Sequence, residues 1–424
     1  MNNFLRRLKL VFKDPDLRKK ILFVLFMLAL FRLGANIPIP GIDQLRLQSF
    51  LAGNQFFGFL NIFSGGGLSK LSIMMLGVAP YITATIIMQL LTMIFPKLKE
   101  LYHEEGEAGR QKFNQYSRLF TVPLAALQGF GLLVLLERQH VLINLGIFDR
   151  ITNIVIVIAG SVLLMWLGEL ISEYGIGNGI SLLIFAGIVA SLPTTITHLL
   201  FTFEPSQIPL YFAFTIVAVL IVAGVVAITE AERLIPVSYA KQVRGMKMYG
   251  GVSTHLPLRV NQAGVIPIIF ALSILLFPQM IANVLANVNS SVVQAISKAL
   301  SVFMNNLWLY GSFYFILVFL FTYFYTAVTF DPEAISTNLQ KSGAFVPGIR
   351  PGRPTAEYIG KILNRITLVG ALFLGAIAVL PLGMQVVTGM RSLAIGGTAL
   401  LIAVSVILET IKQIESQVVM REYE

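Results

Sequence analysis

Apolar residues in this chain come in long uninterrupted runs instead of alternating with polar ones. A segment of about 20 apolar residues is long enough to cross a bilayer as a helix, and the runs of that length predict ten membrane spans. We therefore expect an all-α, polytopic membrane protein. The predicted spans lie at residues 21–38, 71–95, 119–136, 151–171, 180–200, 208–229, 262–286, 307–330, 362–383 and 392–411.

The second predicted span is preceded by a run that is too short to cross. Phe56–Phe63 is apolar, three glycines follow at 65–67, and Leu71–Phe95 is again long enough to span. Glycine permits a sharp reversal, and irregular backbone at membrane depth is tolerated only inside protein or beside a water-filled cavity. We expect a broken, re-entrant helix with Asn61–Ser69 facing a cavity; the alternative is an ordinary external loop.

The composition, with 56% hydrophobic and 12% charged residues, excludes a soluble globular protein. The chain has no cysteine, which excludes disulfides, thiolate metal sites and a thiol nucleophile. Its four histidines have no metal-ligand spacing, and no Walker A motif is present. We expect no cofactor, and no use of ATP by the chain itself.

Lys and Arg are concentrated before the first span, in the even-numbered gaps between spans and in the tail. By the positive-inside rule these segments and both termini face the cytoplasm, so the net charge of +10 does not indicate nucleic-acid recognition. Residues 1–20 form a basic amphipathic lead with Leu5, Leu8, Val11 and Phe12 on one face. Arg32 lies inside the first span and is expected to snorkel to the outer surface, with a functional role as the alternative.

Two patterns in the first half recur in the second. Gly77–Ile82 and Gly264–Ile269 share G-V-x-P-x-I, and Gly179–Ile184 and Gly397–Ile402 share G-x-x-L-L-I. Each match pairs a span with the fifth span after it. Because five is odd, the halves have opposite orientations, which is the inverted-repeat plan of many transporters.

The aligned positions of these repeats are isoleucines. Ile82 aligns with Ile269 and Ile184 with Ile402. Ile86 and Ile188 lie four residues further on and share the same helical faces. They are either packed core residues or a hydrophobic constriction that closes a pore.

The predicted spans are nearly free of charge near mid-membrane. Glu169 and Glu173 are four apart, as an acid/base pair could be, but lie at the cytoplasmic end of their span and are predicted to be surface carboxylates. A secondary transporter of a small solute would need buried ionisable residues, and solute uptake in proteoliposomes would reveal one. An intramembrane enzyme would need a clustered nucleophile, base or metal site, which the spans lack.

Two long cytoplasmic loops are predicted at 233–259 and 331–361. In the second, Gly and Pro at 347–354 make a rigid turn that holds Arg350 and Arg353 in solvent. Such loops are either partner docking sites or plain connectors.

Four motifs together resemble the SecY family, the central subunit of the bacterial protein-translocation channel. They are NIFSGGGLSKLSI, EYGIGNGIS, NQAGVIPIIFA and KSGAFVPGIRPG, in that order along nearly the whole chain. The resemblance implies a non-enzymatic channel that passes unfolded preproteins and releases apolar segments into lipid. Its two inverted five-helix halves would be 21–200 and 201–411, with an hourglass pore between them and a cytoplasmic tail at 412–424.

The resemblance also implies roles for particular residues. The lateral gate would be formed by spans two and three against seven and eight. The assignments are a pore ring of Ile82, Ile86, Ile184, Ile188, Ile269 and Ile402; a plug near 57–67 with Phe57, Asn61, Ile62, Phe63, Ser64, Gly65, Gly66 and Gly67; and gate-seam candidates Thr83, Thr85, Gln89, Gln128 and Ser273.

The partners that the resemblance implies are the small membrane subunits SecE and SecG, the SecA motor ATPase, the ribosome, the translocating preprotein with its signal sequence, and membrane lipid. Docking of the motor or ribosome would use Arg244, Lys247, Arg350 and Arg353, of which Arg350 matches the family arginine in the GIRPG turn. The expected location is the bacterial cytoplasmic membrane.

Overall fold

The computed structural model describes residues 14–422 except 43–45, 48–60, 62–63, 104, 143–145, 202–207, 240–241, 245–246, 250–252, 286–290 and 389–390. The apolar face predicted for residues 1–13 and the plug residues Phe57, Ile62 and Phe63 lie outside the described residues.

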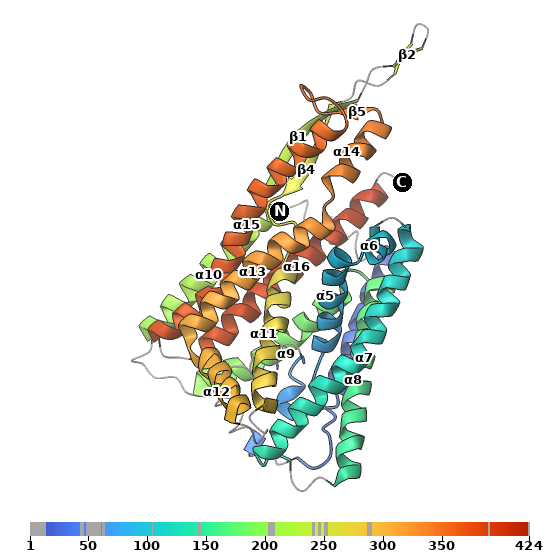
Figure 1. The fold of residues 1–424 in the computed structure, drawn as a ribbon. Helices are drawn as coiled ribbons and strands as arrows, with labels where there is room; N and C mark the ends of the chain where they lie inside the picture. The colour runs from blue at the N-terminus through green and yellow to red at the C-terminus, as the bar shows by residue number, and fades with distance from the viewer. Residues whose placement is uncertain are drawn as a thin grey trace. The chain divides into compact units, whose positions relative to one another are not determined.

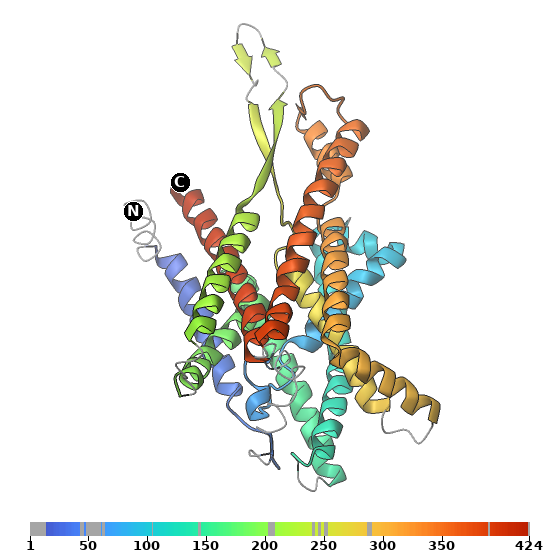
Figure 2. The same cartoon turned by 90° about the vertical axis from the view of Figure 1, so that its left-hand side faces the viewer.

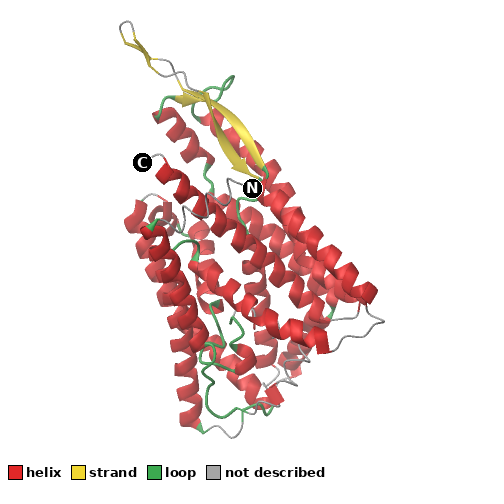
Figure 3. Cartoon of the chain, turned by 180° about the vertical axis from the view of Figure 1, so that it is seen from behind, coloured by secondary structure: helices red, strands yellow, loops and turns green. Residues whose placement is uncertain are grey.

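A helix occupies every run that was predicted to span, and helices dominate the fold (Figure 3). The all-α prediction is confirmed in this sense. The helices are α2 (Pro15–Gly34), α5 (Ala79–Ile94), α7 (Gly106–Arg138), α8 (Ile147–Tyr174), α9 (Gly179–Phe201), α10 (Ile208–Glu230), α11 (Ile266–Leu285), α13 (Leu307–Thr329), α15 (Arg353–Thr388) and α16 (Arg391–Glu422).

Several of these helices are long and apolar enough to cross a membrane. Among the described residues they are Gly106–Glu137, Ile147–Tyr174, Leu307–Lys341 and Arg353–Val386. Ala79–Ile94 and Pro96–Tyr102 make a further candidate, bent by 115° at their junction. The chain is thus a multi-pass membrane protein, and the count of ten spans stays a prediction.

The chain divides into two compact units, of which the first comprises Met1–Thr215, Leu272–Tyr310 and Pro381–Glu424. Within it α7 packs against both α5 and α8, and α9 packs against α8 and α16 (Figure 1). α2 packs against α8 and α9. It begins at Pro15 after Asp14, whose side chain accepts a hydrogen bond from the Asp16 N–H, a standard N-terminal cap.

The tail continues α16 as a helix to Glu422. Val418 is buried in a cluster with Leu17 at the start of α2 and Ile176 in the turn before α9. Apolar residues at 414 and 418 lie on one helical face, which explains why this end of the helix packs.

The second unit comprises Ile216–Ala271 and Gly311–Leu380. The predicted loop after α10 is a twisted β-ribbon (Figure 2), in which β1 (Glu232–Tyr239) pairs antiparallel with β4 (Ser253–Arg259). The two-residue β5 (Ala344–Phe345) pairs with β1, giving the order β4-β1-β5. Ile235, Leu258, Val346 and Ile359 form a buried core under this sheet.

Short elements complete the fold. β2 (Gln242–Arg244) and β3 (Lys247–Tyr249) form a second hairpin. The further helices are η1 (Leu68–Lys70), α6 (Pro96–His103), α12 (Ser291–Asn305) and α14 (Pro332–Lys341). α14 is capped by Asp331, whose side chain accepts from the N–H groups of Glu333 and Ala334.

Candidate functional site

The segment between the triple glycine and α5 is irregular. Residues 71–78 were predicted to be helical, but they form turns, and α5 begins only at Ala79. Leu71 (φ 43°) and Gly77 (φ 62°) adopt left-handed conformations that a regular helix excludes. The second predicted span therefore begins as irregular backbone at 71–78 and continues as a helix of 16 residues.

Backbone and hydroxyl hydrogen bonds close the glycine turn on itself. Gly65 (φ 63°) and Gly66 (φ 83°) take up the left-handed conformations, and the Gly66 N–H donates to the Asn61 carbonyl. The Leu68 N–H donates to Ser64 Oγ, and the Ser69 N–H donates to Asn61 Oδ1. The turn has a defined shape of its own.

This irregular segment is packed inside the first unit. Leu68, Leu71, Met75 and Val78 are at most 1% exposed. Burial in protein is one of the two settings in which irregular backbone is tolerated at membrane depth. Of the described residues in Asn61–Ser69, which were predicted to face a cavity, Ser69 is exposed and Asn61 and Gly66 are partly buried, and the cavity itself stays a prediction.

Glycines on two helices make room for the segment. A Cβ on Gly160 of α8 would overlap the Ile73 carbonyl oxygen, and a Cβ on Gly187 of α9 would overlap the Cα of Gly65. Because each helix crosses the backbone directly, no side chain fits at either glycine.

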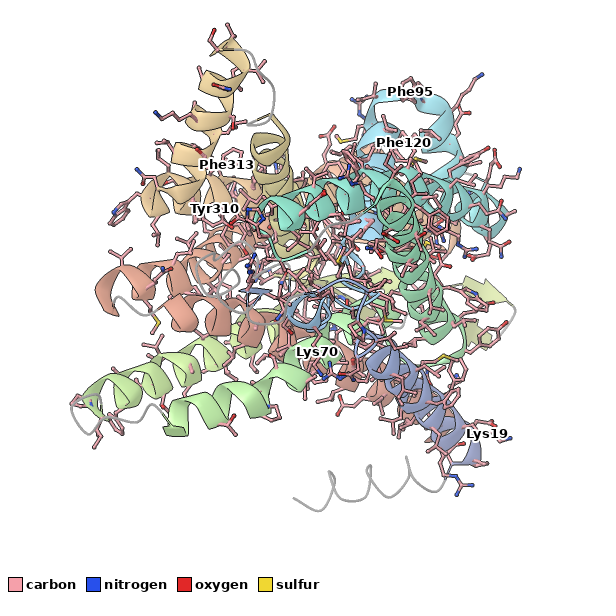
Figure 4. All side chains as sticks on the ribbon, turned by 90° about the horizontal axis from the view of Figure 1, so that it is seen from below. Lys19, Lys70, Phe95, Phe120, Tyr310 and Phe313 are labelled. Carbon is pink, nitrogen blue, oxygen red and sulfur yellow. The ribbon has the colours of Figure 1, made fainter. Side chains whose placement is uncertain are left out.

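The chain just after α2, at residues 36–39, contacts the other side of the segment. The Ile39 N–H donates to the Leu71 carbonyl and the Ile73 N–H to the Ile37 carbonyl. Lys70 Nζ donates to the side-chain oxygen of Asn36. In Figure 4, Lys70 lies at the end of α2 opposite the one that carries Lys19.

Arg32 takes part in the same contact. Its Nη1 donates to the Gly65 carbonyl oxygen at 2.9 Å, and the side chain is partly buried. The guanidinium points to the glycine turn, and snorkelling of Arg32 toward the outer surface stays a prediction.

The six isoleucines of the predicted ring are all at most 5% exposed. Ile82 and Ile86 lie on α5, Ile184 and Ile188 on α9, Ile402 on α16, and Ile269 near the start of α11 in the second unit.

Within the first unit the glycine turn lies next to one of these positions. Gly187, which contacts Gly65, is three residues after Ile184, so the two share a face of α9. The turn therefore lies on the face of α9 that carries Ile184.

Of the seam candidates, Thr83 and Gln89 on α5 are buried. Among the described residues, Thr83 Oγ1 and Gln89 Oε1 have no hydrogen-bond partner. Thr85 donates within its own helix to the Tyr81 carbonyl. Gln128 on α7 and Ser273 on α11 are also buried.

The basic residues proposed for docking lie in two places: Arg244 and Lys247 in the β2–β3 hairpin, and Arg350 and Arg353 between β5 and the start of α15. Arg350 and Arg353 are exposed, and Arg353 forms an ion pair of 3.5 Å with Glu357. Thr355 donates to the Arg350 carbonyl, which fixes the turn. Arg244 pairs with Lys247 in the backbone register at the end of the β2–β3 hairpin.

Glu169 is less exposed than was predicted for a surface carboxylate. It was predicted to be a surface carboxylate, but it accepts from Arg118 Nε at 2.7 Å, and its side chain is only 16% exposed. The pair joins α7 to α8. Its partner is 51 residues away, so the helical spacing with Glu173 could not show it.

Sequence reasoning missed three residues of this site, namely Arg32 as a partner of Gly65 and the two glycines Gly160 and Gly187. A glycine inside an apolar helix signals close approach of another backbone, but the approaching segment cannot be identified from the sequence. Among the described residues, no group of three or more His, Asp or Glu is placed to hold a metal ion.

A multi-pass helical protein that buries an irregular glycine-rich segment against its spans belongs to the class of membrane channels and transporters. A family model for SecY matches residues 72–411. The chain belongs to the SecY family, as its four motifs indicated.

Curated relatives and solved structures agree with this assignment. The chain is 45% identical to protein translocase subunit SecY of Corynebacterium glutamicum, over 97% of this chain and 98% of the relative. It is 44% identical to the subunit of the same name from Streptomyces galbus, over 97% of each.

Its fold is similar to a structure described as a protein-conducting channel, with a TM-score of 0.65, 18% identity and coverage of 93% of this chain and 91% of the other. A second structure, of a SecY protein whose plug domain is described as stabilising the closed state of the channel, has a TM-score of 0.63 at 18% identity, with the same coverage. Sec61 in a canine ribosome-channel complex has a TM-score of 0.61 at 18% identity, again with the same coverage. The predicted function of a protein-conducting channel is confirmed at the level of the family.

Proposed function

We propose that this chain forms the pore through which unfolded preproteins cross the membrane, with Ile82, Ile86, Ile184, Ile188, Ile269 and Ile402 as its constriction. One observation carries the proposal: the backbone of the glycine turn lies on the face of α9 that carries Ile184. A turn in that position blocks access to the residue from its own side.

The apolar character of the ring suits its task. Isoleucine offers no hydrogen-bond partner, so an extended polypeptide of any sequence slides past without being held. An apolar segment in transit gains by moving sideways into lipid, through a seam that Thr83, Thr85, Gln89, Gln128 and Ser273 would soften. The halves 21–200 and 201–411 would be the two walls of this pore.

The glycine turn acts as the plug. Support comes from the burial of Ser64, Gly65 and Gly67 and from the relative whose plug domain is described as maintaining a membrane seal. The plug would extend over residues 57–67.

The driving force comes from partners. The canine Sec61 complex contains a ribosome, which supports a ribosome as one partner here. The exposed Arg350 and Arg353, with Arg244 and Lys247, would dock the ribosome or the SecA motor, while SecE and SecG would complete the membrane complex. The bacterial relatives and the distribution of Lys and Arg support the cytoplasmic membrane, with both termini in the cytoplasm.

Photocrosslinking in a stalled translocation intermediate tests the ring. A photoreactive residue at Ile86 or Ile402 should form adducts with the passenger polypeptide, because a ring residue contacts whatever fills the pore. Val155 on α8 is 58% exposed and serves as the control, which should give lipid or subunit adducts only. Passenger adducts that are absent from both ring positions would show that the ring assignment is wrong.

A further inference from the structure

A charged side chain at the end of an apolar helix can usually reach water or the membrane interface. An arginine that is instead hydrogen-bonded to buried protein backbone therefore needs an explanation. Arg32 lies in the last turn of α2, after the apolar run that begins at Ile21. Among the described residues, no carboxylate forms an ion pair with it, and its hydrogen bond goes to the Gly65 carbonyl.

The carbonyl that Arg32 binds belongs to the residue with the tightest surroundings in the turn. Gly65 is confined between α2 and α9: a Cβ on it would overlap the Phe31 ring, and Gly187 approaches from the other side. Gly65 has a φ of 63°, a left-handed conformation that other residues rarely adopt. Arg32 is therefore hydrogen-bonded to the residue of the turn that packs most closely against α2 and α9.

A second contact ties the other end of the turn to the same part of α2. Lys70 Nζ donates to Asn36 Oδ1, and Asn36 Nδ2 donates to the Arg32 carbonyl at 2.7 Å. The turn from Gly65 to Lys70 is thus bound at one end by Arg32, in the last turn of α2, and at the other by Asn36, just after that helix. Both bonds involve a cation and a neutral oxygen, so neither forms a desolvated ion pair that would be costly to break.

We propose that Arg32 is a positioning residue that latches the plug in its closed position through the Gly65 carbonyl. The inference rests on the proposed function of the turn as a plug. Because the acceptor is a backbone carbonyl, the latch is independent of the plug's side chains. When the turn leaves α9, the guanidinium exchanges this carbonyl for water in the opened pore, so release is reversible.

The test uses the absence of cysteine in the natural sequence. Ser64 is fully buried in the turn, and Ser64→Cys introduces a single thiol there. In membranes that contain the assembled complex, we measure how fast a water-soluble maleimide labels it. Arg32→Met, which keeps an unbranched side chain but has no donor, is expected to raise the labelling rate by about tenfold or more. Arg32→Lys keeps a charge and a donor, and it should raise the rate less than Arg32→Met.

Ser117→Cys is the matched control, since Ser117 is equally buried on α7 and bonds only within its own helix, to the Phe113 carbonyl. Its labelling rate should not respond to Arg32→Met. An unchanged rate at Ser64→Cys, equal rates for the two Arg32 variants, or a parallel rise at Ser117→Cys would each overturn the latch.

A measurement of preprotein translocation by the unaltered protein distinguishes failure of the latch from failure of the proposed channel function. If translocation fails while labelling at Ser64→Cys still depends on Arg32, the channel proposal is wrong and the contact is only structural. If translocation succeeds and labelling ignores Arg32, the latch alone is wrong.

Discussion

Gly187 of α9 lies so close to Gly65 that a Cβ on Gly187 would overlap the Gly65 Cα. The contact joins a helix that carries two of the proposed ring residues to the turn that is proposed to block the pore. Both residues must be glycine, Gly187 for space and Gly65 for space and for its φ of 63°.

Gly187→Ala should therefore displace the turn from α9. We expect ion leakage through proteoliposomes containing the purified complex to rise about tenfold, because overpacking at a close contact costs about 1–3 kcal/mol. Gly383→Ala on α15 is the control, since no atom of the described residues lies within 4 Å of a Cβ at Gly383. Equal leakage from the two variants would show that the contact does not hold the plug.

Gly160→Val should destabilise the first unit, because its side chain would collide with the backbone at Ile73. The expected loss is at least about 1–3 kcal/mol. Thermal unfolding of the detergent-purified complex measures it. Gly129→Ala on α7 is the comparison, because the atoms nearest to its Cβ lie at ordinary contact distances of 3.5 Å and more. Unfolding midpoints that agree for the two variants would contradict this packing.

Arg350→Glu should block motor-driven translocation while leaving membrane insertion intact. Arg350 is exposed on a turn held by Thr355, so charge reversal changes the surface without disturbing the fold. Preprotein transport into membrane vesicles measures the effect, and protease protection reports insertion. Lys361→Glu, a charge reversal further along α15, is the control. Normal transport by Arg350→Glu would remove the docking assignment.

Val418→Ala should loosen the end of α16. Val418 is buried with Leu17 and Ile176, and the loss of buried methyl groups costs about 1–2 kcal/mol. Limited trypsin digestion should release the tail faster, since Lys412 becomes accessible when the helix end detaches. Ile411→Ala, at a position that is 47% exposed, should have a smaller effect. A tail that is cleaved at the same rate in both variants would mean that the buried cluster is not what holds it.

The sequence predicted the elements that depend on local composition. Runs of apolar residues identified a helix at every expected span, and the four motifs identified the family. The ends of the helices differ from the predicted span ends where polar residues continue a helix beyond the apolar run. Examples are α7, which begins at Gly106, and α16, which ends at Glu422.

What the sequence could not predict depends on partners distant along the chain. The 71–78 segment is apolar enough to be helical, yet it is irregular: the chain after α2 hydrogen-bonds to its backbone at Leu71 and Ile73, and Gly160 of α8 packs directly against Ile73. The acceptor of Arg32 is 33 residues away, so snorkelling was the simpler interpretation. The β-ribbon was missed because its alternation of buried and exposed positions is short: in β1 only Ile235 and Val237 are buried.

The backbone bonds that join Ile39 to Leu71 and Ile37 to Ile73 limit how far the intervening chain can travel. If residues 57–67 act as the plug, as proposed, these bonds on either side would tether it near the channel mouth. A passing polypeptide would then leave the plug within reach of its closed position.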